Sequence, residues 1–272
     1  MTSPTQITVS QLSRLVGLPD APVLVDVCID EDFADDPRLL PTAFRHPYQD
    51  IAALAPKLAG QRVVVICQKG RKLSQGAAAV LRNCGIAAES LEGGVFGWRD
   101  AELPMVPASA LPVHDPEGRT VWVTRHRPKI DRISCPWLIR RFVDRNAQFL
   151  FVEPSEVQTV AEKFNATPFD VEDVFWSHRG DQCTFDTMIR EFALETEPMK
   201  HLATIIRGAD TNRHDLAPES AGLMAASLGL SRMYRDDLAQ LDAGMALYDA
   251  FYRWVRDASN EGHDWPAATT GA

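Results

Sequence analysis

The sequence predicts an α/β protein with two domains. Its first half alternates apolar β-branched runs with amphipathic or alanine-rich segments, which is typical of parallel strands joined by helices. The clearest pair is the run at residues 63–66 and the alanine-rich segment at residues 75–81. The second half predicts a helix-rich α/β or α+β domain. With 272 residues, of which 45% are hydrophobic, the chain is long enough for two ordinary cores.

A proline-rich stretch marks the boundary between the two domains. Residues 104–116 contain four prolines among small residues, which is the composition of a linker. We therefore expect a first domain at residues 1–108, a linker at 109–118, a second domain at 119–260 and a tail at 261–272.

Charge and cysteine content argue against several classes of protein. The formal net charge of -9 disfavours non-specific binding to nucleic acid or to an anionic membrane. No run approaches 18 apolar residues, and the start of the sequence does not resemble a signal peptide. Five cysteines at wide spacings, without a C-x-x-C pair, indicate free thiols in a reducing compartment. We expect a soluble, cytoplasmic protein without disulfides.

The first domain is expected to alternate helices and strands along its length. Asp26 lies in an apolar strand, where backbone donors near the strand end would satisfy a buried carboxylate, so a structural role is favoured over catalysis. Ser10 is the expected N-cap of the first helix, and Gly85 is the expected C-terminal cap of a later one. In order, we expect a helix at 8–16, a strand at 23–27, a surface loop at 31–41, a helix at 48–58, a strand at 63–66, a helix from 75 to about 84 and a strand ending at 91.

Cys67 is the candidate nucleophile. It follows the strand at residues 63–66 and precedes a helix, so unsatisfied backbone N–H groups and the helix dipole attract negative charge there. Lys69, Arg71 and Lys72 add positive charge within the next five positions. Both effects favour the thiolate, which is the nucleophilic form of cysteine. The alternative is a buried and inert cysteine, which is common for this residue type.

Three segments of the first domain resemble the rhodanese family of sulfurtransferases. They are Leu24-Val25-Asp26-Val27, the loop Cys67-Gln68-Lys69-Gly70-Arg71-Lys72, and Leu91-Glu92-Gly93-Gly94-Val95-Phe96-Gly97-Trp98 with Leu103-Pro104, in the order and separation found in the family. The resemblance covers about residues 6–107. It implies that Cys67 accepts a sulfane sulfur as a persulfide without a cofactor. It also implies that the backbone N–H groups of the six-residue loop bind the substrate.

Departures from the family pattern bear on the choice of substrate. Cys28 stands where the family usually has an arginine, and residues 40–46 replace the usual Gly-His-Ile-Pro-Gly-Ala stretch. Compared with the Cys-Arg-Lys-Gly-Val-Thr loop of thiosulfate-using members, this loop keeps Cys67, Lys69 and Gly70 and remains basic. The resemblance therefore implies a thiosulfate-like donor.

The second domain is expected to contain two strands and several helices. Apolar residues from Tyr234 to Val255 repeat at alternating spacings of four and three, which predicts one long amphipathic helix. This helix would pack either in the core or as a dimer seam, and its length of about three heptads favours the core. Ser134 as N-cap and Pro136 in the first turn predict a helix at 137–145. The other elements are strands at 120–124 and 149–152 and helices at 154–164, 187–194 and 199–208.

Three segments of this domain resemble the C-terminal domain of ChrB-type chromate-resistance proteins. They are residues 127–142, which include Asp-Arg-Ile-Ser-Cys-Pro-Trp-Leu-Ile-Arg-Arg-Phe, residues 177–185 and residues 247–250. The resemblance covers about residues 119–258. It implies a role in chromate resistance or in chromate-responsive regulation, but it supplies no chemical mechanism.

Polar residues of the second domain allow three interpretations. His178, Asp131, Asp210 and His214, with Cys183 near His178 in the sequence, could bind a transition metal. Arg132, Arg140, Arg179 and the N-terminus of the helix at Pro136 could instead form an oxyanion pocket, for chromate for example. In the third interpretation the same groups form a structural hydrogen-bond network around a buried histidine.

The whole chain is therefore expected to be a sulfurtransferase in a chromate-resistance or oxidative-stress context. Sulfur would pass from a thiosulfate-like donor through Cys67 to a thiol, a protein or cyanide. The alternative is a non-catalytic sensor, in which the chain binds an oxyanion or a metal and regulates the response to chromate.

Overall fold

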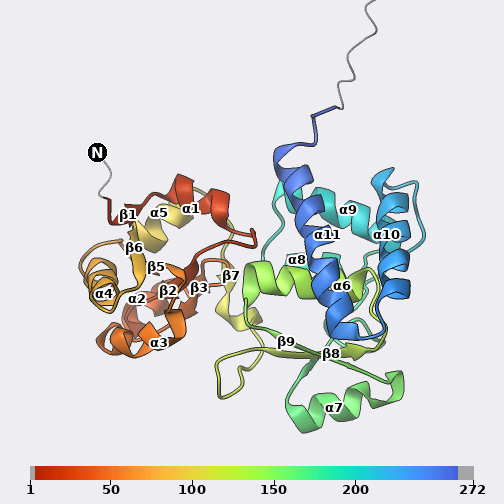
Figure 1. Ribbon diagram of the computed structural model, residues 1–272, viewed down its shortest axis with the longest axis horizontal. Coiled ribbons are helices and arrows are strands. Elements are labelled where there is room, and N and C mark those ends of the chain that lie inside the picture. Colours follow the sequence, from red (N-terminus) through yellow and green to blue (C-terminus); the bar gives the residue numbers. More distant parts are fainter. Residues whose placement is uncertain (1–3, 263–272) are drawn as a thin grey trace, which may run out of the picture.

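The computed structural model describes residues 4–262, which form two lobes that lie side by side (Figure 1). The expected tail at 261–272 falls almost wholly outside this range. Among the residues described, no helix is both long enough and apolar enough to cross a membrane.

A five-stranded parallel sheet is the centre of the first lobe. Its strands are β1 (Gln6–Ile7), β2 (Val23–Asp26), β4 (Phe44–Arg45), β5 (Arg62–Ile66) and β6 (Ala87–Leu91), in the spatial order β1-β6-β5-β2-β4. Asp26 pairs with Ile66, so the carboxyl ends of β2 and β5 lie next to each other. Every strand pair in this sheet is parallel, which confirms the predicted α/β class.

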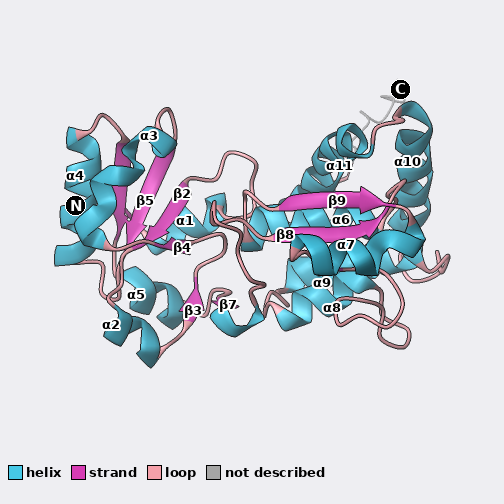
Figure 2. Ribbon diagram, turned by 90° about the horizontal axis from the view of Figure 1, so that it is seen from below, coloured by secondary structure: helices cyan, strands magenta, loops and turns pink. Residues whose placement is uncertain are grey.

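Helices cover both faces of this sheet. They are α1 (Val9–Leu15), α2 (Asp30–Asp35), α3 (Ala55–Leu58), α4 (Lys72–Asn83) and α5 (Gly94–Asp100). Helices α3 and α4 lie on one side and α5 on the other (Figure 2), with α1 beside α5 (Figure 1). Parallel strands covered in this way are mostly apolar, and all four residues of β2 are buried, including Asp26 at its end.

Several local expectations for the first lobe were wrong. The N-cap of α1 is Thr8 rather than Ser10, because Thr8 and Gln11 form a reciprocal capping box. The expected loop at 31–41 contains α2 and the strand β3 (Arg38–Leu39), and the expected helix at 48–58 begins as a 3₁₀ helix at Tyr48–Leu54. At the end of the first predicted domain, β7 (Val106–Pro107) pairs with β3, which does not conflict with a linker at 109–118.

The second lobe is built on a smaller sheet between unequal helical layers. Its strands are β8 (Val121–Arg125), β9 (Gln148–Val152) and β10 (Thr167–Pro168), in the order β10-β8-β9, all parallel. Alternate residues of β8 face opposite cores: Trp122 belongs to the large core and Val123 to a small cluster with α7 (Val157–Phe164). Figure 1 shows α7 on one side of the sheet and the other helices on the opposite side.

Five helices make the large layer of the second lobe. They are α6 (Asp131–Leu138), which continues as a π-helix at Ile139–Val143, α8 (Thr184–Glu191), α9 (Glu197–Asp210), α10 (Glu219–Met233) and α11 (Asp237–Asp257). Residues Leu241, Met245, Tyr248, Tyr252 and Val255 of α11 are buried, so the core packing expected for this helix is confirmed. Helix α10 was not predicted. It is rich in glycine, alanine and serine, and such small residues give little of the apolar periodicity that indicates a helix.

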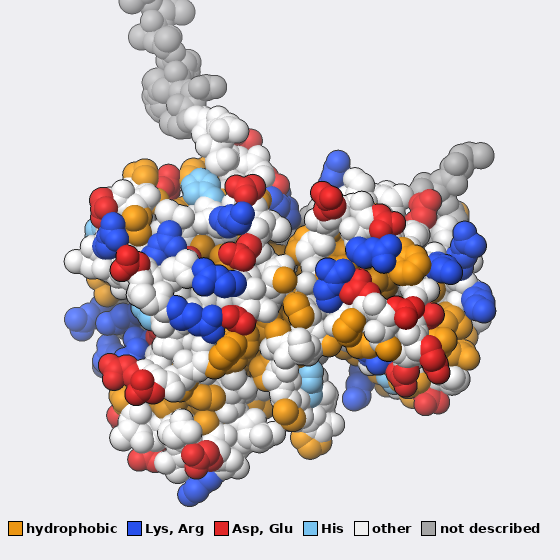
Figure 3. Space-filling view, turned by 180° about the vertical axis from the view of Figure 1, so that it is seen from behind, with side chains coloured by type: hydrophobic (Ala, Val, Ile, Leu, Met, Phe, Trp, Pro, Cys, Tyr) orange, Lys and Arg blue, Asp and Glu red, His pale blue; other side chains and the backbone are white. Residues whose placement is uncertain are grey.

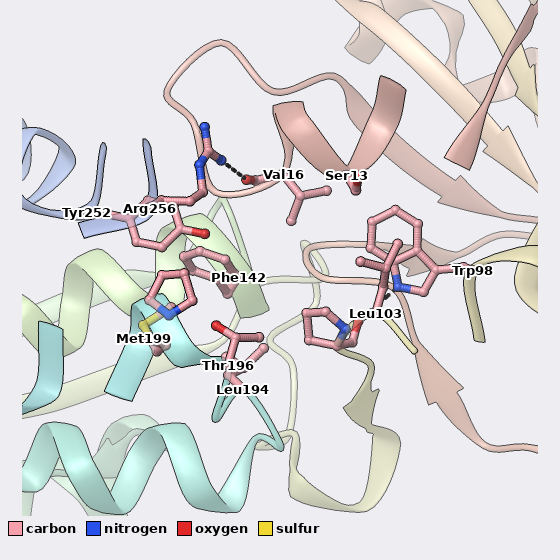
Figure 4. A pocket seen from close by; sticks show the side chains of 12 residues that line it. Ser13, Val16, Trp98, Leu103, Phe142, Leu194, Thr196, Met199, Tyr252 and Arg256 are labelled. Atoms are coloured by element: carbon pink, nitrogen blue, oxygen red, sulfur yellow. Dashed lines mark hydrogen bonds between the residues drawn. The ribbon is translucent and has the colours of Figure 1, made fainter. Parts of the chain in front are cut away.

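Side chains from both lobes meet at their junction. The backbone N–H of Thr42 donates to the carbonyl oxygen of Phe142 (3.0 Å), and the Arg256 guanidinium donates to the carbonyl oxygen of Val16 (3.4 Å). A small, mostly apolar cavity of about 160 Å³ lies there, with Trp98 on the side of the first lobe and Phe142 on the other (Figure 4). On the surface, acidic and basic side chains are interspersed over both lobes in the view of Figure 3.

The loop after Cys67 packs backbone against backbone on the turn that precedes α5. The carbonyl oxygen of Cys67 accepts the N–H of Val95 (3.1 Å). A Cβ atom at Gly94 would lie 2.0 Å from that carbonyl oxygen and 2.4 Å from the backbone nitrogen of Gly70, and Gly94 also has a φ of +59°. Glycine at position 94 is therefore required both by space and by backbone conformation.

We predict that Gly94→Ala lowers the free energy of unfolding by roughly 2 kcal/mol or more, because the new methyl group overlaps two backbone atoms of the loop. Urea denaturation measures the effect. The matched control is Gly76→Ala, at an exposed position inside α4 where a Cβ would meet nothing within 4 Å. That change should stabilise the protein by roughly 0.5–1 kcal/mol. Equal effects of the two substitutions would contradict the packing argument.

Candidate functional sites

Cys67 lies at the carboxyl edge of the first sheet, directly after β5. Its side chain is buried, and its Sγ lies 3.1 Å from the hydroxyl oxygen of Ser74, which is itself fully buried in the first turn of α4. The hydroxyl can donate its hydrogen either to the sulfur or to the Arg71 carbonyl oxygen (3.3 Å), and in the second case it can accept the hydrogen of the thiol. Sequence reasoning did not single out Ser74, although a serine or threonine in the first turn of the following helix is a usable signal.

Unpaired backbone N–H groups lie in the loop that begins at Cys67 and in the first turn of α4. Helix α4 starts at Lys72, three residues earlier than expected, so its N-terminus directly follows the loop. In the described part of the chain, the backbone N–H groups of residues 68, 69 and 71–74 have no hydrogen-bond acceptor. Lys69, Arg71 and Lys72 are exposed at the rim. This edge of the sheet can therefore receive an anionic group beside the thiol.

Cys28 and Asp26 lie next to this edge, at the end of β2. The Asp26 carboxylate accepts the backbone N–H of Cys28 (2.8 Å), as expected for a structural acid. Burial raises the pKa of Asp26. Burial and the adjacent Asp26 carboxylate raise the pKa of Cys28, so this thiol stays protonated at neutral pH. Cys28 is therefore a weak nucleophile compared with a thiolate.

In the second lobe, three carboxylates converge on one imidazole nitrogen. His178 Nε2 lies 3.2 Å from an oxygen of Asp210, 3.4 Å from one of Asp170 and 3.6 Å from one of Asp131. We call these four residues the His178 cluster. The structure therefore brings together three of the four residues that we expected to bind a metal. It adds Asp170, and it leaves the fourth, His214, exposed and without a contact to the cluster.

Asp131 is positioned by an unusual helix start. Helix α6 begins at Asp131, not at residue 137 as expected, and Pro136 lies inside it. The preceding residue, Ile130, has a φ of 41°, which is a genuine outlier for a β-branched residue and costs of the order of 1–3 kcal/mol. Its carbonyl oxygen accepts the hydroxyl of Tyr248 (3.1 Å), which holds this turn against α11.

Hydrogen bonds and burial set the charge states of the His178 cluster. Burial, together with the nearby Asp210 and Asp170 carboxylates, raises the pKa of Asp131 well above its usual range. Hydrogen bonds to Asp170 and Asp210 raise the pKa of His178 to about 10. Burial opposes ionisation of Asp170, but hydrogen bonds from His178 and Thr184 lower its pKa overall. The imidazole is therefore cationic at neutral pH.

The arginines of the expected oxyanion pocket do not meet. Arg132 lies 3.3 Å from Asp170, whereas Arg140 pairs with Asp242 and Arg179 with Glu191. Each guanidinium is thus paired with a different carboxylate, and the helix at Pro136 has no free end there because it begins at Asp131. Cys183 is buried as the N-cap residue of α8 and has no recorded contact with His178.

A pH titration should reveal the charged His178. A histidine whose pKa is raised in the folded state stabilises the fold most fully below its ordinary pKa of about 6.5, and this stabilisation disappears as the pH rises through about 10. We therefore expect the excess free energy of unfolding of the wild type over His178→Gln to decrease from pH 6.5 to pH 10. Chemical denaturation in chelator-containing buffer measures it. A pH-independent difference would show that the histidine is not charged in the fold.

Comparison with known proteins shows a sequence similarity that covers the second lobe. Residues 122–255 match the family model described as ChrB, C-terminal domain. Protein ChrB of Cupriavidus metallidurans is 32% identical over 149 residues, which are 53% of this chain and 44% of ChrB. The chain thus spans less than half the length of that relative.

Solved structures with similarity to the chain include rhodanese-like domains. A rhodanese-related protein of Thermoplasma volcanium is 20% identical, with a TM-score of 0.32, over 37% of this chain and 96% of its own. A rhodanese-like domain protein of Staphylococcus aureus is 28% identical, with a TM-score of 0.31, over 35% of this chain and 90% of its own. A thiosulfate sulfurtransferase of Pseudomonas aeruginosa is 23% identical, with a TM-score of 0.34, over 39% of this chain and 20% of its own. Residues 122–255 are therefore similar to the C-terminal domain of ChrB, and the solved structures named here are similar to 35–39% of the chain.

Proposed function

We propose that the protein is a sulfurtransferase that carries sulfane sulfur as a persulfide on Cys67. The observation that carries this proposal is the surrounding of the thiol: the Ser74 hydroxyl lies 3.1 Å from Sγ, and six unpaired backbone N–H groups lie in the loop and the first turn of α4. An inert buried cysteine has no use for such donors. A persulfide anion and an anionic donor both need them.

The reaction is a double displacement. The Cys67 thiolate attacks the outer sulfur of thiosulfate, the sulfur–sulfur bond of the donor breaks, and sulfite leaves with the electron pair. The enzyme is left with a Cys67 persulfide. A thiolate or cyanide acceptor then attacks the terminal sulfur and regenerates the Cys67 thiolate. No oxidant, metal or cofactor takes part in this balance.

The loop residues have separate roles in the proposed reaction. The unpaired backbone N–H groups of Gln68 and its neighbours hold the anion, while Gly70, whose own N–H donates to the Cys67 carbonyl oxygen (3.4 Å), shapes the loop where it packs on the turn before α5. The exposed Lys69, Arg71 and Lys72 attract an anionic donor to the rim.

A second candidate function is binding without turnover. The same N–H groups would hold a tetrahedral oxyanion such as chromate, and the chain would then act as a sensor in the response to chromate. This candidate is favoured by the ChrB C-terminal domain, and in the sequence resemblance some ChrB-type proteins have a regulatory role. Steady turnover of thiosulfate in the presence of an acceptor distinguishes the two, because a sensor releases no sulfite.

Replacement of Cys67 by Ser should abolish sulfur transfer and leave the fold intact, since the two side chains are nearly isosteric and a serine alkoxide is not accessible at neutral pH. Cys28→Ser and the exposed Cys84→Ser are the matched controls and should stay active. Mass spectrometry after thiosulfate treatment should find one added sulfur atom on the peptide that contains Cys67. Full activity of Cys67→Ser, with the adduct on another cysteine, would refute the assignment.

Neutralising Lys69 should impair the use of an anionic donor more than neutralising Arg71 or Lys72 does, because Lys69 occupies the basic position of the thiosulfate-using loops. We expect Lys69→Ala to lower kcat/KM for thiosulfate by about tenfold, corresponding to about 1.4 kcal/mol. With an uncharged persulfide donor the loss should be small. If kcat/KM falls equally with both donors, Lys69 supports the loop and does not select the donor.

A further inference from the structure

The His178 cluster takes no part in the proposed sulfur chemistry. It lies in the second lobe, where Asp131 and Asp170 are buried and His178 and Asp210 reach the surface. We propose that Asp131, Asp170, His178 and Asp210 form a binding site for a divalent first-row transition cation. The proposal does not depend on the chemistry of Cys67.

The geometry around His178 Nε2 exceeds what hydrogen bonding needs. One imidazole N–H donates one linear hydrogen bond, yet oxygens of three different carboxylates lie 3.2, 3.4 and 3.6 Å from this nitrogen. In a tetrahedral site with metal–ligand bonds of roughly 2.0–2.2 Å, neighbouring ligand atoms are roughly 3.3–3.6 Å apart. Ligand atoms of Asp131, Asp170 and His178 all lie within 4.8 Å of one another. A shared cation accounts for this convergence.

Further contacts hold the two buried carboxylates in place. Asp131 accepts the backbone N–H of Thr184 (2.6 Å) at the start of α8. Asp170 accepts the Thr184 hydroxyl on one oxygen (2.8 Å), while Arg132 lies 3.3 Å from the other. Such outer contacts orient metal ligands and keep them ionised. One oxygen of Asp170 faces His178 and the other faces the arginine, so the arginine does not occupy the position of the cation.

The charges of the cluster select a cation and not an anion. Three carboxylates would repel an oxyanion, and the two nearby guanidinium groups, of Arg132 (3.3 Å) and Arg125 (3.4 Å), are both paired with the same outer oxygen of Asp170. Asp131 is completely buried beside two other acids, an arrangement that is costly unless positive charge lies among them. Protonated His178 supplies one positive charge to the cluster, whereas a bound divalent cation would supply two and would displace the proton from Nε2 into solvent.

The donor set indicates which cations fit. One imidazole nitrogen and three carboxylate oxygens suit borderline or hard ions such as Zn²⁺ and Mn²⁺. A soft ion such as Cu⁺ would need thiolate ligands, and the buried Cys183 instead caps α8. The side chain of His178 is 41% exposed and that of Asp210 19%, so a cation can enter from the surface and reach the buried pair.

Metal binding to the full chain tests the proposal. After removal of bound metal with a chelator, the protein is titrated with Zn²⁺ or Mn²⁺ alone by calorimetry, and Mn²⁺ is also followed by electron paramagnetic resonance. We expect one equivalent to bind to the wild type. In His178→Ala the affinity should fall at least tenfold, whereas His214→Ala, which removes an exposed histidine outside the cluster, should bind like the wild type.

Two outcomes would overturn the proposal: the wild type takes up no stoichiometric Zn²⁺ or Mn²⁺, or a correctly folded His178→Ala binds either ion as tightly as the wild type. Circular dichroism checks the fold of each variant. If His178→Ala is misfolded, Asp210→Asn replaces it under the same criterion, because that side chain is partly exposed and the substitution keeps its shape. Cys67→Ser should bind metal normally, so failure of the sulfur-transfer proposal would leave this test unaffected.

Discussion

The close approach between the Cys67 loop and the Gly93–Gly94 turn is the constraint on which the first lobe depends. The Cys67 carbonyl oxygen caps the start of α5, and Gly94 lies against both that oxygen and the backbone of Gly70. Because these contacts involve backbone atoms, they leave the loop N–H groups free and fixed in direction. The cysteine loop and the distant Gly-Gly turn are thus two halves of one structural unit, and a change in either would move the anion-binding donors.

In the second lobe, too, a hydrogen-bond acceptor from one segment caps the start of a distant helix, but here the acceptor is a side-chain carboxylate instead of a backbone carbonyl. Asp131 begins α6, yet its carboxylate accepts the N–H groups of Thr184 and Phe185 at the start of α8. Two helix N-termini, both positive ends of helix dipoles, therefore face one buried acid. These donors lower the cost of burying Asp131 completely, and Ile130, directly before it, adopts a costly backbone conformation at the same turn.

Local patterns in the sequence predicted the longer strands of both main sheets, but they missed the two-residue strands β1, β4 and β10 and misplaced several helix starts. The unbroken apolar run of β5 and the apolar stripe of α11 could both be read directly from the sequence, because the same residues are buried in the folded protein. The start of α6 was misplaced because Ser134 and Pro136 are good local signals for an N-terminus, whereas the true start is stabilised by contacts with α8 and α11, far away in the sequence. Asp170 was missed for a related reason. Its short strand carries no periodic signal, although an acid that follows a strand parallel to β8 belongs at the same edge as the residues that follow β8.

The two sites occupy equivalent positions at the edges of their sheets but carry side chains of opposite charge. Each lies beyond the carboxyl ends of parallel strands, where helix N-termini gather and the potential is positive. In the first lobe this potential is left uncompensated and is reinforced by three exposed cations, so the edge attracts an anion. In the second lobe Asp131 and Asp170 place carboxylates at this edge, and on our proposal they bind a cation there. On these proposals an anionic ligand belongs at Cys67, and the packed junction at Phe142 and Arg256 is one of the connections between that site and the second lobe.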